Sequence, residues 1–403
     1  MMREFELKNG IKSVYKKNTE TPRMAITMNF SIDDEEKYAG TYSLMTRLLL
    51  QGTNKYNNEE LAKILDENGI EIIADMKQDY LRFRLLCLNE DFPKAIELLE
   101  DIVKNSTFTE FEKERIKMKG ELVAELDSAR LKVSDAFVKT MYEGHYYGHT
   151  YTNILENIDK ITKEDVVSSY KKILTSSKKI IAVVGSLEED DVINLLSKYF
   201  NDLDNDNCAK KTFVASVLDK PKKTEVIKED AKQAQILQGW RMPTFKEEDY
   251  PVMLCINTIL GASGLSSRLF RELREKKGLA YTVRTSCEIK ELSAVFSIYI
   301  ATEPSNIEIC LKGFKEEIDK IKTELVSEEE LQNAKNNIYG KHEFIVETNF
   351  QQSTSLAYYG INDLPFGYYD EMQKKINAVT PEQVKIAANK YFNDNSVIAI
   401  LHP

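Results

Sequence analysis

The sequence predicts an α+β fold built from two homologous α/β-sandwich halves. Glycine pairs recur half a chain apart, because Gly52 and Gly69 lie 209 positions before Gly261 and Gly278. Similar helix and strand patterns follow each pair in the same order, which indicates an internal duplication. These segments do not alternate as simple β-α-β units, which favours a sandwich in each half over a doubly wound parallel sheet.

Each copy has an amphipathic helix between its two glycines, over residues 58–68 and 266–277. Apolar residues recur at helical spacing in both stretches, and the second glycine of each pair stands where a helix ends. The residues that form the two apolar faces are Leu61, Ile64, Leu65, Leu269, Phe270 and Leu273.

A strand and a second helix follow in each copy. Residues 81–87 and 294–300 are rich in alternating apolar residues, as is typical of strands. The periodicity after them predicts helices over residues 92–103 and 306–321.

Each copy then ends in the same way. Thr162 and Thr380 stand in similar segments, each at a position that suits a helix N-cap. The apolar segments 180–184 and 397–401 predict the strands that close the two copies.

These patterns divide the chain into an N-terminal domain over residues 1–200 and a C-terminal domain over residues 225–403. The polar segment 201–224 between them contains Asp202, Asp204, Asp206, Pro221 and three lysines in its last five residues. Such a composition is typical of a linker. We therefore expect two halves that face each other as a clamshell half-chamber.

The composition excludes several classes of function. Lys and Arg number 55 and Asp and Glu 65, a net charge of −10, without the basic stripe that nucleic-acid binding requires. No apolar run approaches the roughly 18 residues of a membrane span, and the first ten residues contain two glutamates, unlike a targeting segment. Five scattered cysteines lack a disulfide or zinc-ribbon pattern. We therefore expect a cytoplasmic protein with no membrane or nucleic-acid partner.

Common nucleotide and hydrolase motifs are absent. Neither a P-loop nor a Gly-x-Gly-x-x-Gly loop occurs, so phosphate cradling has no support. Ser263 lies between Ala262 and Gly264, but Leu265 stands where a nucleophile elbow needs its last glycine. A serine hydrolase is therefore disfavoured.

The histidines do not form a metal motif by themselves. The chain has only His145, His149, His342 and His402. The first two lie four apart, but glycines interrupt the segment and no third ligand accompanies them, so we interpret them as structural. His342-Glu343 fails to complete His-Glu-x-x-His because Val346 takes the second histidine's position.

One segment in the N-terminal half, residues 40–53, matches a known catalytic frame in outline. It resembles the Gly-x-x-His-x-x-Glu-His frame, followed by apolar residues and Gly-Thr, of the pitrilysin and insulinase-type zinc peptidases. This family includes the mitochondrial processing peptidase and bacterial relatives, and the resemblance covers essentially the whole chain. It implies that Ser43, Thr46 and Arg47 replace the two zinc-binding histidines and the glutamate base.

These replacements predict a degenerate site without metal. Ser43 is a poor zinc ligand, Thr46 cannot act as a carboxylate base, and the fixed charge of Arg47 opposes a dication. The family's third ligand is a glutamate in a frame that residues 111–122 match, so the resemblance places Glu121 there. Without the histidines, we read Glu121 as a solvated or arginine-paired helix acid.

A second segment, residues 261–281, resembles the C-terminal half of the same family. In heterodimeric relatives, the subunit without the zinc motif supplies an arginine and a tyrosine seven residues apart to the shared active site. Arg274 and Tyr281 have that spacing. The resemblance implies that Arg274 holds a substrate carbonyl or carboxylate and that Tyr281 donates to a developing oxyanion.

The resemblance also implies a role for the glycine loop. Residues 261–264 coincide with the loop implicated in substrate contact in the non-catalytic subunit of the processing peptidase, so Gly261 and Gly264 are candidate substrate-binding residues. The alternative is a plain loop that precedes the helix starting near Ser266. The sequence leaves the two readings open.

The leading hypothesis is therefore a zinc-less subunit of a heterodimeric metallopeptidase, inactive alone. Its partner would be a homologous chain that carries His-x-x-Glu-His and the zinc, and its substrate an extended peptide. Three alternatives remain: a scaffolding subunit like the related core proteins of respiratory complexes, a stand-alone peptide-binding protein, and, last, an autonomous metallopeptidase with unrecognised ligands.

Overall fold

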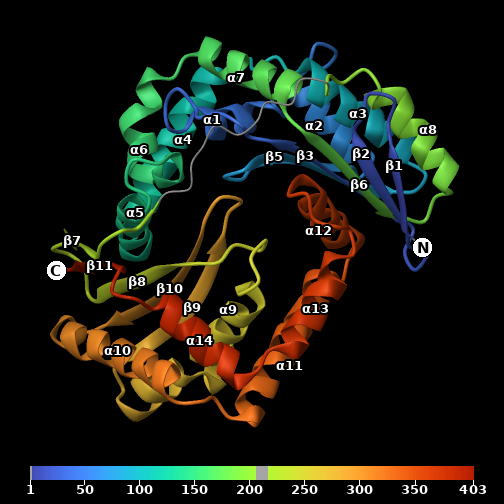
Figure 1. Cartoon of the computed structure of the whole chain (residues 1–403). Helices are drawn as coiled ribbons and strands as arrows, with labels where there is room; N and C mark the ends of the chain where they lie inside the picture. The colour runs from blue at the N-terminus through green and yellow to red at the C-terminus, as the bar shows by residue number, and fades with distance from the viewer. Residues whose placement is uncertain (1, 206–216) are drawn as a thin grey trace. The chain divides into compact units, whose positions relative to one another are not determined.

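The computed structural model describes residues 2–205 and 217–403 (Figure 1). They form two compact units: residues 2–121, 153–205 and 343–368 make unit 1, and residues 122–152, 217–342 and 369–403 make unit 2. Residues 206–216 of the linker predicted over 201–224 lie outside the described residues, and a strand already begins at Lys222.

A six-stranded sheet forms the centre of unit 1, in the order β1-β2-β6-β3-β5-β4. Neighbouring strands are antiparallel except for β2 and β6, which are parallel. The strands are β1 (Met2–Glu6), β2 (Lys12–Lys17), β3 (Arg23–Ser31), β4 (Glu71–Met76), β5 (Tyr80–Leu88) and β6 (Lys179–Gly185).

Helices with capped ends cover this sheet. At α2, the Asn57 side chain accepts from the Glu60 backbone, and the predicted N-cap Thr162 does the same for Asp165 at α7. The helices that lie mainly in unit 1 are α1 (Thr41–Leu48), α2 (Asn58–Glu67), α3 (Phe92–Asn105), α4 (Phe111–Leu126), α6 (Tyr151–Asn157), α7 (Lys163–Ser176), α8 (Glu189–Phe200) and α12 (Asn349–Ile361).

Unit 2 contains a five-stranded sheet in the order β7-β11-β8-β10-β9, with β7 and β11 parallel. Its strands are β7 (Lys222–Ile227), β8 (Ala234–Met242), β9 (Ala280–Ile289), β10 (Ala294–Thr302) and β11 (Val397–His402). Its main helices are α5 (Ala129–Met141), α9 (Tyr250–Asn257), the π-helices η3 (Thr258–Ala262) and η5 (Phe270–Lys276), α10 (Ile307–Thr323), α11 (Glu328–Ile345), α13 (Tyr368–Ala378) and α14 (Pro381–Tyr391).

The duplication is visible in the strand order. Without β1, the unit 1 order β2-β6-β3-β5-β4 corresponds strand by strand to β7-β11-β8-β10-β9, including the single parallel pair. This confirms the predicted class of two α/β-sandwich halves. The helix predicted over 266–277 is found, but mainly as the π-helix η5.

The two units exchange one helix each. Helix α5 comes from the N-terminal half of the sequence and packs on β7, β8 and β11 of unit 2. Helix α12 comes from the C-terminal half and packs on β3 and β6 of unit 1, where Ser353 Oγ lies 2.9 Å from Thr27 Oγ1. The division into domains of residues 1–200 and 225–403 stays a prediction. Helices α5 and α12 do not follow it, because each packs on the sheet formed mainly by the other half of the sequence.

Packing of α5 depends on a glycine. A Cβ added at Gly239 of β8 would lie 2.5 Å from Phe137 Cζ on α5 and 2.8 Å from the Phe296 carbonyl oxygen. We expect Gly239→Ala to lower the free energy of unfolding of unit 2 by about 1–3 kcal/mol, because the strand and the helix must move apart. Urea denaturation measures this change.

Gly340→Ala is the matched control. Gly340 lies in α11, and an added Cβ would meet no atom within 4 Å. Alanine there should be neutral or stabilising by up to about 1 kcal/mol. Equal effects of the two substitutions would contradict the close approach of α5 to β8.

Within residues 2–205 and 217–403, no helix combines the length and the apolar character that a membrane span needs.

Candidate functional site

The first candidate site lies on α1, which starts at a glycine turn. Gly40 has a left-handed backbone (φ 97°), and the Glu36 carboxylate accepts hydrogen bonds from the Gly40 and Tyr42 amides, 2.9 Å each. A carboxylate at this end satisfies two exposed donors and opposes the positive end of the helix dipole. This cap fixes the start of the helix that carries Ser43, Thr46 and Arg47.

The hydroxyl of Thr46 is turned back onto the helix. Thr46 is buried, and its Oγ1 donates to the Tyr42 carbonyl oxygen at 2.7 Å. Ser43 is half-buried on the same helix. A neutral hydroxyl bonded to the main chain can neither abstract a proton from water nor serve as a strong zinc ligand.

Arg47, which stands where the resemblance puts the second histidine, pairs with carboxylates on α4. Its Nη2 donates to Glu121 on α4, and its Nη1 lies 3.8 Å from the carboxylate of buried Glu114. The arginine hydrogen bond holds the pKa of Glu121 below its usual value. The structure thus shows Glu121 as an arginine-paired acid, and a zinc ion does not fit beside this fixed guanidinium.

Removing the guanidinium should release Glu121. We expect Arg47→Gln to raise the Glu121 pKa toward its ordinary value, measured by NMR titration of the glutamate carboxyl carbons. Because the folded-state pKa is lowered, the pairing stabilises the fold above about pH 4.5 and this contribution disappears as pH falls through the lowered pKa. The stability difference between wild type and variant should therefore shrink in acid. An unchanged Glu121 titration would show that the pair does not form in solution.

The second candidate site is the turn between η5 and β9. Gly278 (φ 63°) ends the helix, and the Leu279 amide donates to the Leu273 carbonyl at 2.9 Å, the bond pattern of a glycine-terminated helix. Reversal at this turn brings Arg274 back beside Tyr281. Arg274 Nη1 donates to the Tyr281 carbonyl oxygen at 2.5 Å.

Ring stacking also holds the Arg274 guanidinium. Its Cζ lies 4.7 Å from the centroids of both the Phe270 and Tyr281 rings. The Tyr281 side chain is 78% exposed. The structure therefore brings together the two residues predicted to act as a pair, and leaves the tyrosine accessible to a ligand.

The glycine loop divides into a buried and an open part. Gly261 is buried in η3, where an added Cβ would lie 2.5 Å from the Thr285 amide nitrogen of β9. The absence of a side chain at Gly261 lets η3 pack closely against β9. Gly264 (φ 77°) has no atom within 4 Å of an added Cβ, and Leu265 beside it is 73% exposed. Only this second part presents itself to a ligand.

Two family models match the chain. The model described as "Insulinase (Peptidase family M16)" matches residues 12–155, and the one described as "Peptidase M16 inactive domain" matches residues 160–338. The chain belongs to peptidase family M16.

Similar proteins carry the name of zinc proteases. This M16 chain is 26% identical to the uncharacterized zinc protease YmxG of Bacillus subtilis, over 100% of this chain and 98% of the relative. It is 25% identical to an uncharacterized zinc protease of Mycobacterium leprae, over 93% and 84% of the two chains.

Solved structures share the fold. A protease from Helicobacter pylori has a TM-score of 0.92 at 22% identity, with 100% of both chains covered. A peptidase M16 inactive domain from Pseudomonas fluorescens has a TM-score of 0.91 at 21% identity, covering 100% of this chain and 98% of that chain. At these identities the likeness establishes the fold.

Two of the four histidines of the M16 chain, His145 and His342, lie against aromatic rings. His145 accepts from the Tyr147 amide at 3.1 Å and packs against three tyrosine rings, and His342 stacks on Tyr369. Burial lowers the pKa of His342 to about 4. In the described parts of the chain, no group of three or more His, Cys, Asp or Glu residues could hold a metal ion.

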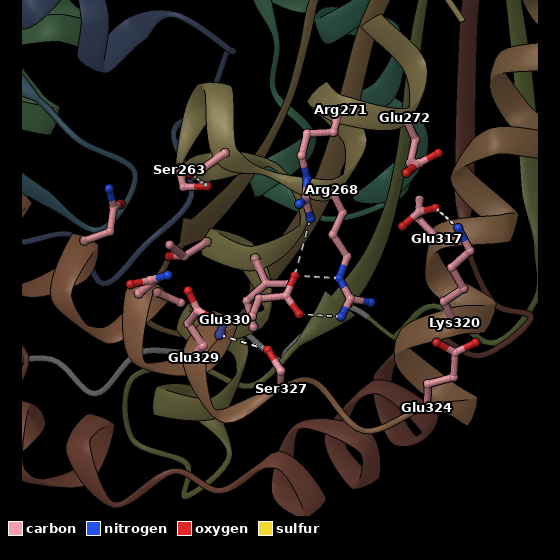
Figure 2. Close-up of a pocket in the computed structure, with 16 residues that line it drawn as sticks. Ser263, Arg268, Arg271, Glu272, Glu317, Lys320, Glu324, Ser327, Glu329 and Glu330 are labelled. Carbon is pink, nitrogen blue, oxygen red and sulfur yellow. Dashed lines mark hydrogen bonds and ion pairs between the residues drawn. The ribbon is translucent and has the colours of Figure 1, made fainter. Parts of the chain in front are cut away.

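Sequence reasoning missed a polar cavity of about 560 Å³ in unit 2 (Figure 2). It lies among η5, α10, α11 and the loop after η3, and its wall contains the ion pair of Arg268 and Glu330. The wall joins residues 258–272 with residues 317–337, so no local motif marks the cavity. Alternating charges on η5 and α10 were the only signal.

Proposed function

We propose that this chain is the zinc-less subunit of a heterodimeric M16 metallopeptidase and is inactive alone. A homologous partner chain would bring His-x-x-Glu-His and the zinc. The observation that carries the proposal is the contrast between the two candidate sites. Arg47 closes the metal position through Glu121, whereas Arg274 and Tyr281 stay together at an accessible turn.

The proposed role of unit 2 is to hold a peptide substrate and to assist its cleavage. Arg274 has further N–H groups beyond the one bonded to Tyr281, and they would bind a substrate carbonyl or carboxylate. The Tyr281 hydroxyl would donate to the oxyanion that develops during hydrolysis. Gly261 and Gly264 complete the proposed substrate-binding set, with Gly264 as the exposed member and Gly261 supporting the loop from within.

An open sheet edge supports a peptide ligand. Strand β9 lies at the end of its sheet and begins with Ala280 and Tyr281. Its outer backbone groups are not used by another strand of that sheet, so an extended peptide could add to it through main-chain hydrogen bonds. Tyr281 would then lie directly beside the bound peptide.

The test is affinity isolation of the tagged chain at its native level, followed by mass spectrometry of the proteins that co-purify in equal amount. A related chain with His-x-x-Glu-His supports the proposal. Recovery of this chain alone, or within an unrelated assembly, counts against it. We place the complex in the cytoplasm, and fractionation of the same cells tests that location.

A scaffolding subunit is the second candidate. One observation favours it: a chain of Complex III2 from Candida albicans has the same fold, with a TM-score of 0.80 at 14% identity. Under this alternative, the chain would hold a larger assembly together, and Arg274 and Tyr281 would serve only the local turn. The same isolation would then recover a stable assembly in which replacement of Arg274 leaves catalysis unchanged.

A further inference from the structure

Two exposed arginines of unit 2 converge on one nearly buried tyrosine. Arg284 of β9 is the register partner of Tyr299 on β10, so the two side chains leave the same face of the sheet. Arg130, in the first turn of α5, reaches the same ring from the helix that packs on this sheet. Each guanidinium carbon lies 5.5 Å from the ring centroid, whereas Tyr299 itself is only 8% exposed.

The chain supplies no counter-ion for these two arginines. In residues 2–205 and 217–403, the tyrosine ring is their shared partner and no carboxylate pairs with either guanidinium. The acids that lie close to them in the sequence are held by other cations. Asp127 pairs with Lys228 at 3.0 Å. Glu288 pairs with Lys290 at 3.2 Å. The arginine pair therefore carries two positive charges that the described residues leave uncompensated.

Arginines on the corresponding strands of unit 1 are neutralised. Arg82 and Arg84 on β5 share the carboxylate of Asp75 on the edge strand β4, with nitrogen to oxygen distances of 2.5 and 3.2 Å. Their side chains are 10% and 18% exposed. Strands β4 and β9 hold the same place in the two sheets. Among the described residues, the lack of an acid beside Arg284 is therefore a difference between the units and not a property of the fold.

Arg284 also lies on the strand proposed to receive the peptide. Three positions separate it from Tyr281, which is about 10 Å along a strand. A peptide added to the outer edge of β9 would pass both residues. Alternate side chains of that peptide would lie on the same face of the sheet as the Arg284 side chain, and a directly opposite one would be within its reach.

We propose that Arg284 and Arg130 select an acidic residue of the peptide, a glutamate or aspartate about three residues from the position that meets Tyr281. This inference rests on the proposed function, because it needs a peptide along β9. Arg284 donates charge-assisted hydrogen bonds to the acidic side chain from the edge strand. Arg130 raises the positive potential beside it, and the Tyr299 ring supports both guanidinium groups. The substrate class is an extended acidic peptide.

Fluorescence anisotropy of labelled peptides with the purified full chain tests the proposal. The peptides are capped at both ends and differ in one residue, which is Glu, Gln or Lys and is moved along the peptide. At one position, the Glu peptide should bind at least about tenfold more tightly than the Gln peptide, because only the carboxylate accepts charge-assisted hydrogen bonds. This comparison uses the unchanged protein and does not depend on any variant.

Charge reversal provides the second measurement. Arg130→Glu combined with Arg284→Glu should reverse the preference, so that the Lys peptide binds more tightly than the Glu peptide. Both positions are exposed, and a glutamate in the first turn of α5 suits the helix dipole, so thermal unfolding should show a folded variant. The control is Lys312→Glu with Lys374→Glu, exposed positions on α10 and α13 that change the net charge equally. It should change the preference less than about twofold.

The outcomes separate this inference from the proposed function. Peptides that bind without a preference for Glu, or with a preference that survives charge reversal, would overturn the inference and leave peptide binding by unit 2 intact. A neutral peptide with an uncapped C-terminus that binds as tightly as the capped Glu peptide would also overturn it, because the arginines would then recognise a chain end. Failure of every peptide to bind would contradict the proposed function and this inference together.

Discussion

Replacing Arg274 by alanine should lower kcat/KM of the assembled peptidase by about 100-fold. A guanidinium positioned on the substrate carbonyl acts most strongly as negative charge develops, and loss of one such donor typically costs about 100- to 1,000-fold. The structure holds the Arg274 guanidinium in place, because its Nη1 donates to the Tyr281 carbonyl oxygen and its plane stacks on two rings. Steady-state cleavage of a fluorogenic peptide by the complex measures the effect.

Conservative variants distinguish a catalytic role of Arg274 and Tyr281 from a role in holding the local turn. Tyr281→Phe keeps the ring that stacks on Arg274 and removes only the hydroxyl, so we expect a smaller loss of about tenfold, mainly in kcat. Arg274→Lys keeps the charge but loses the planar fork, so rescue should be partial. Lys276→Ala, on the same helix and paired with Glu272, is the control and should leave turnover unchanged. Full turnover by Arg274→Ala in an intact complex would favour the scaffolding alternative.

The sequence predicted the repeated elements well because their signals are local. Helix periodicity, capping threonines and glycine stops depend on residues within one or two turns, and Thr162, Thr380 and Gly278 lie where those signals put them. The contact between Arg274 and Tyr281 is local in the same way, whereas their role in catalysis rests on the resemblance and stays a prediction. A helix, a glycine turn and a strand start determine that contact within eight residues.

Contacts between residues far apart in the sequence have no comparable local sequence signal. The exchange of α5 and α12 depends on which sheet each helix covers, and both helices are equally compatible with either half by periodicity alone. The pairing of Arg47 with Glu121 joins residues 74 positions apart. The sequence allowed either a solvated or a paired glutamate, and only the hydrogen bond from Arg47 on α1 to Glu121 on α4 distinguishes them.

The residue at position 47 also decides whether this frame can bind zinc. We expect Ser43→His combined with Arg47→His to create a zinc site with micromolar or tighter affinity, where the wild-type chain binds none at this position. The two substitutions place imidazoles four residues apart on α1, and removal of the guanidinium frees Glu121, which the arginine now contacts, to act as third ligand. Calorimetry and metal analysis measure the affinity and the stoichiometry, and zinc should raise the melting temperature of the variant.

The comparison that isolates position 47 keeps the arginine. Ser43→His alone should bind no zinc, because the fixed cation of Arg47 still holds Glu121 and repels a dication. Adding Glu121→Gln to the double variant should abolish binding as well, since an amide is a much weaker ligand for zinc than a carboxylate. If the folded double variant binds no zinc, α1 and α4 do not preserve the ligand geometry. The same conclusion follows if the variant still binds zinc after Glu121→Gln. Zinc binding that depends on both positions would show that the residues at 43 and 47 together keep zinc out of this site, and that the surrounding helices still hold the geometry of a metal centre.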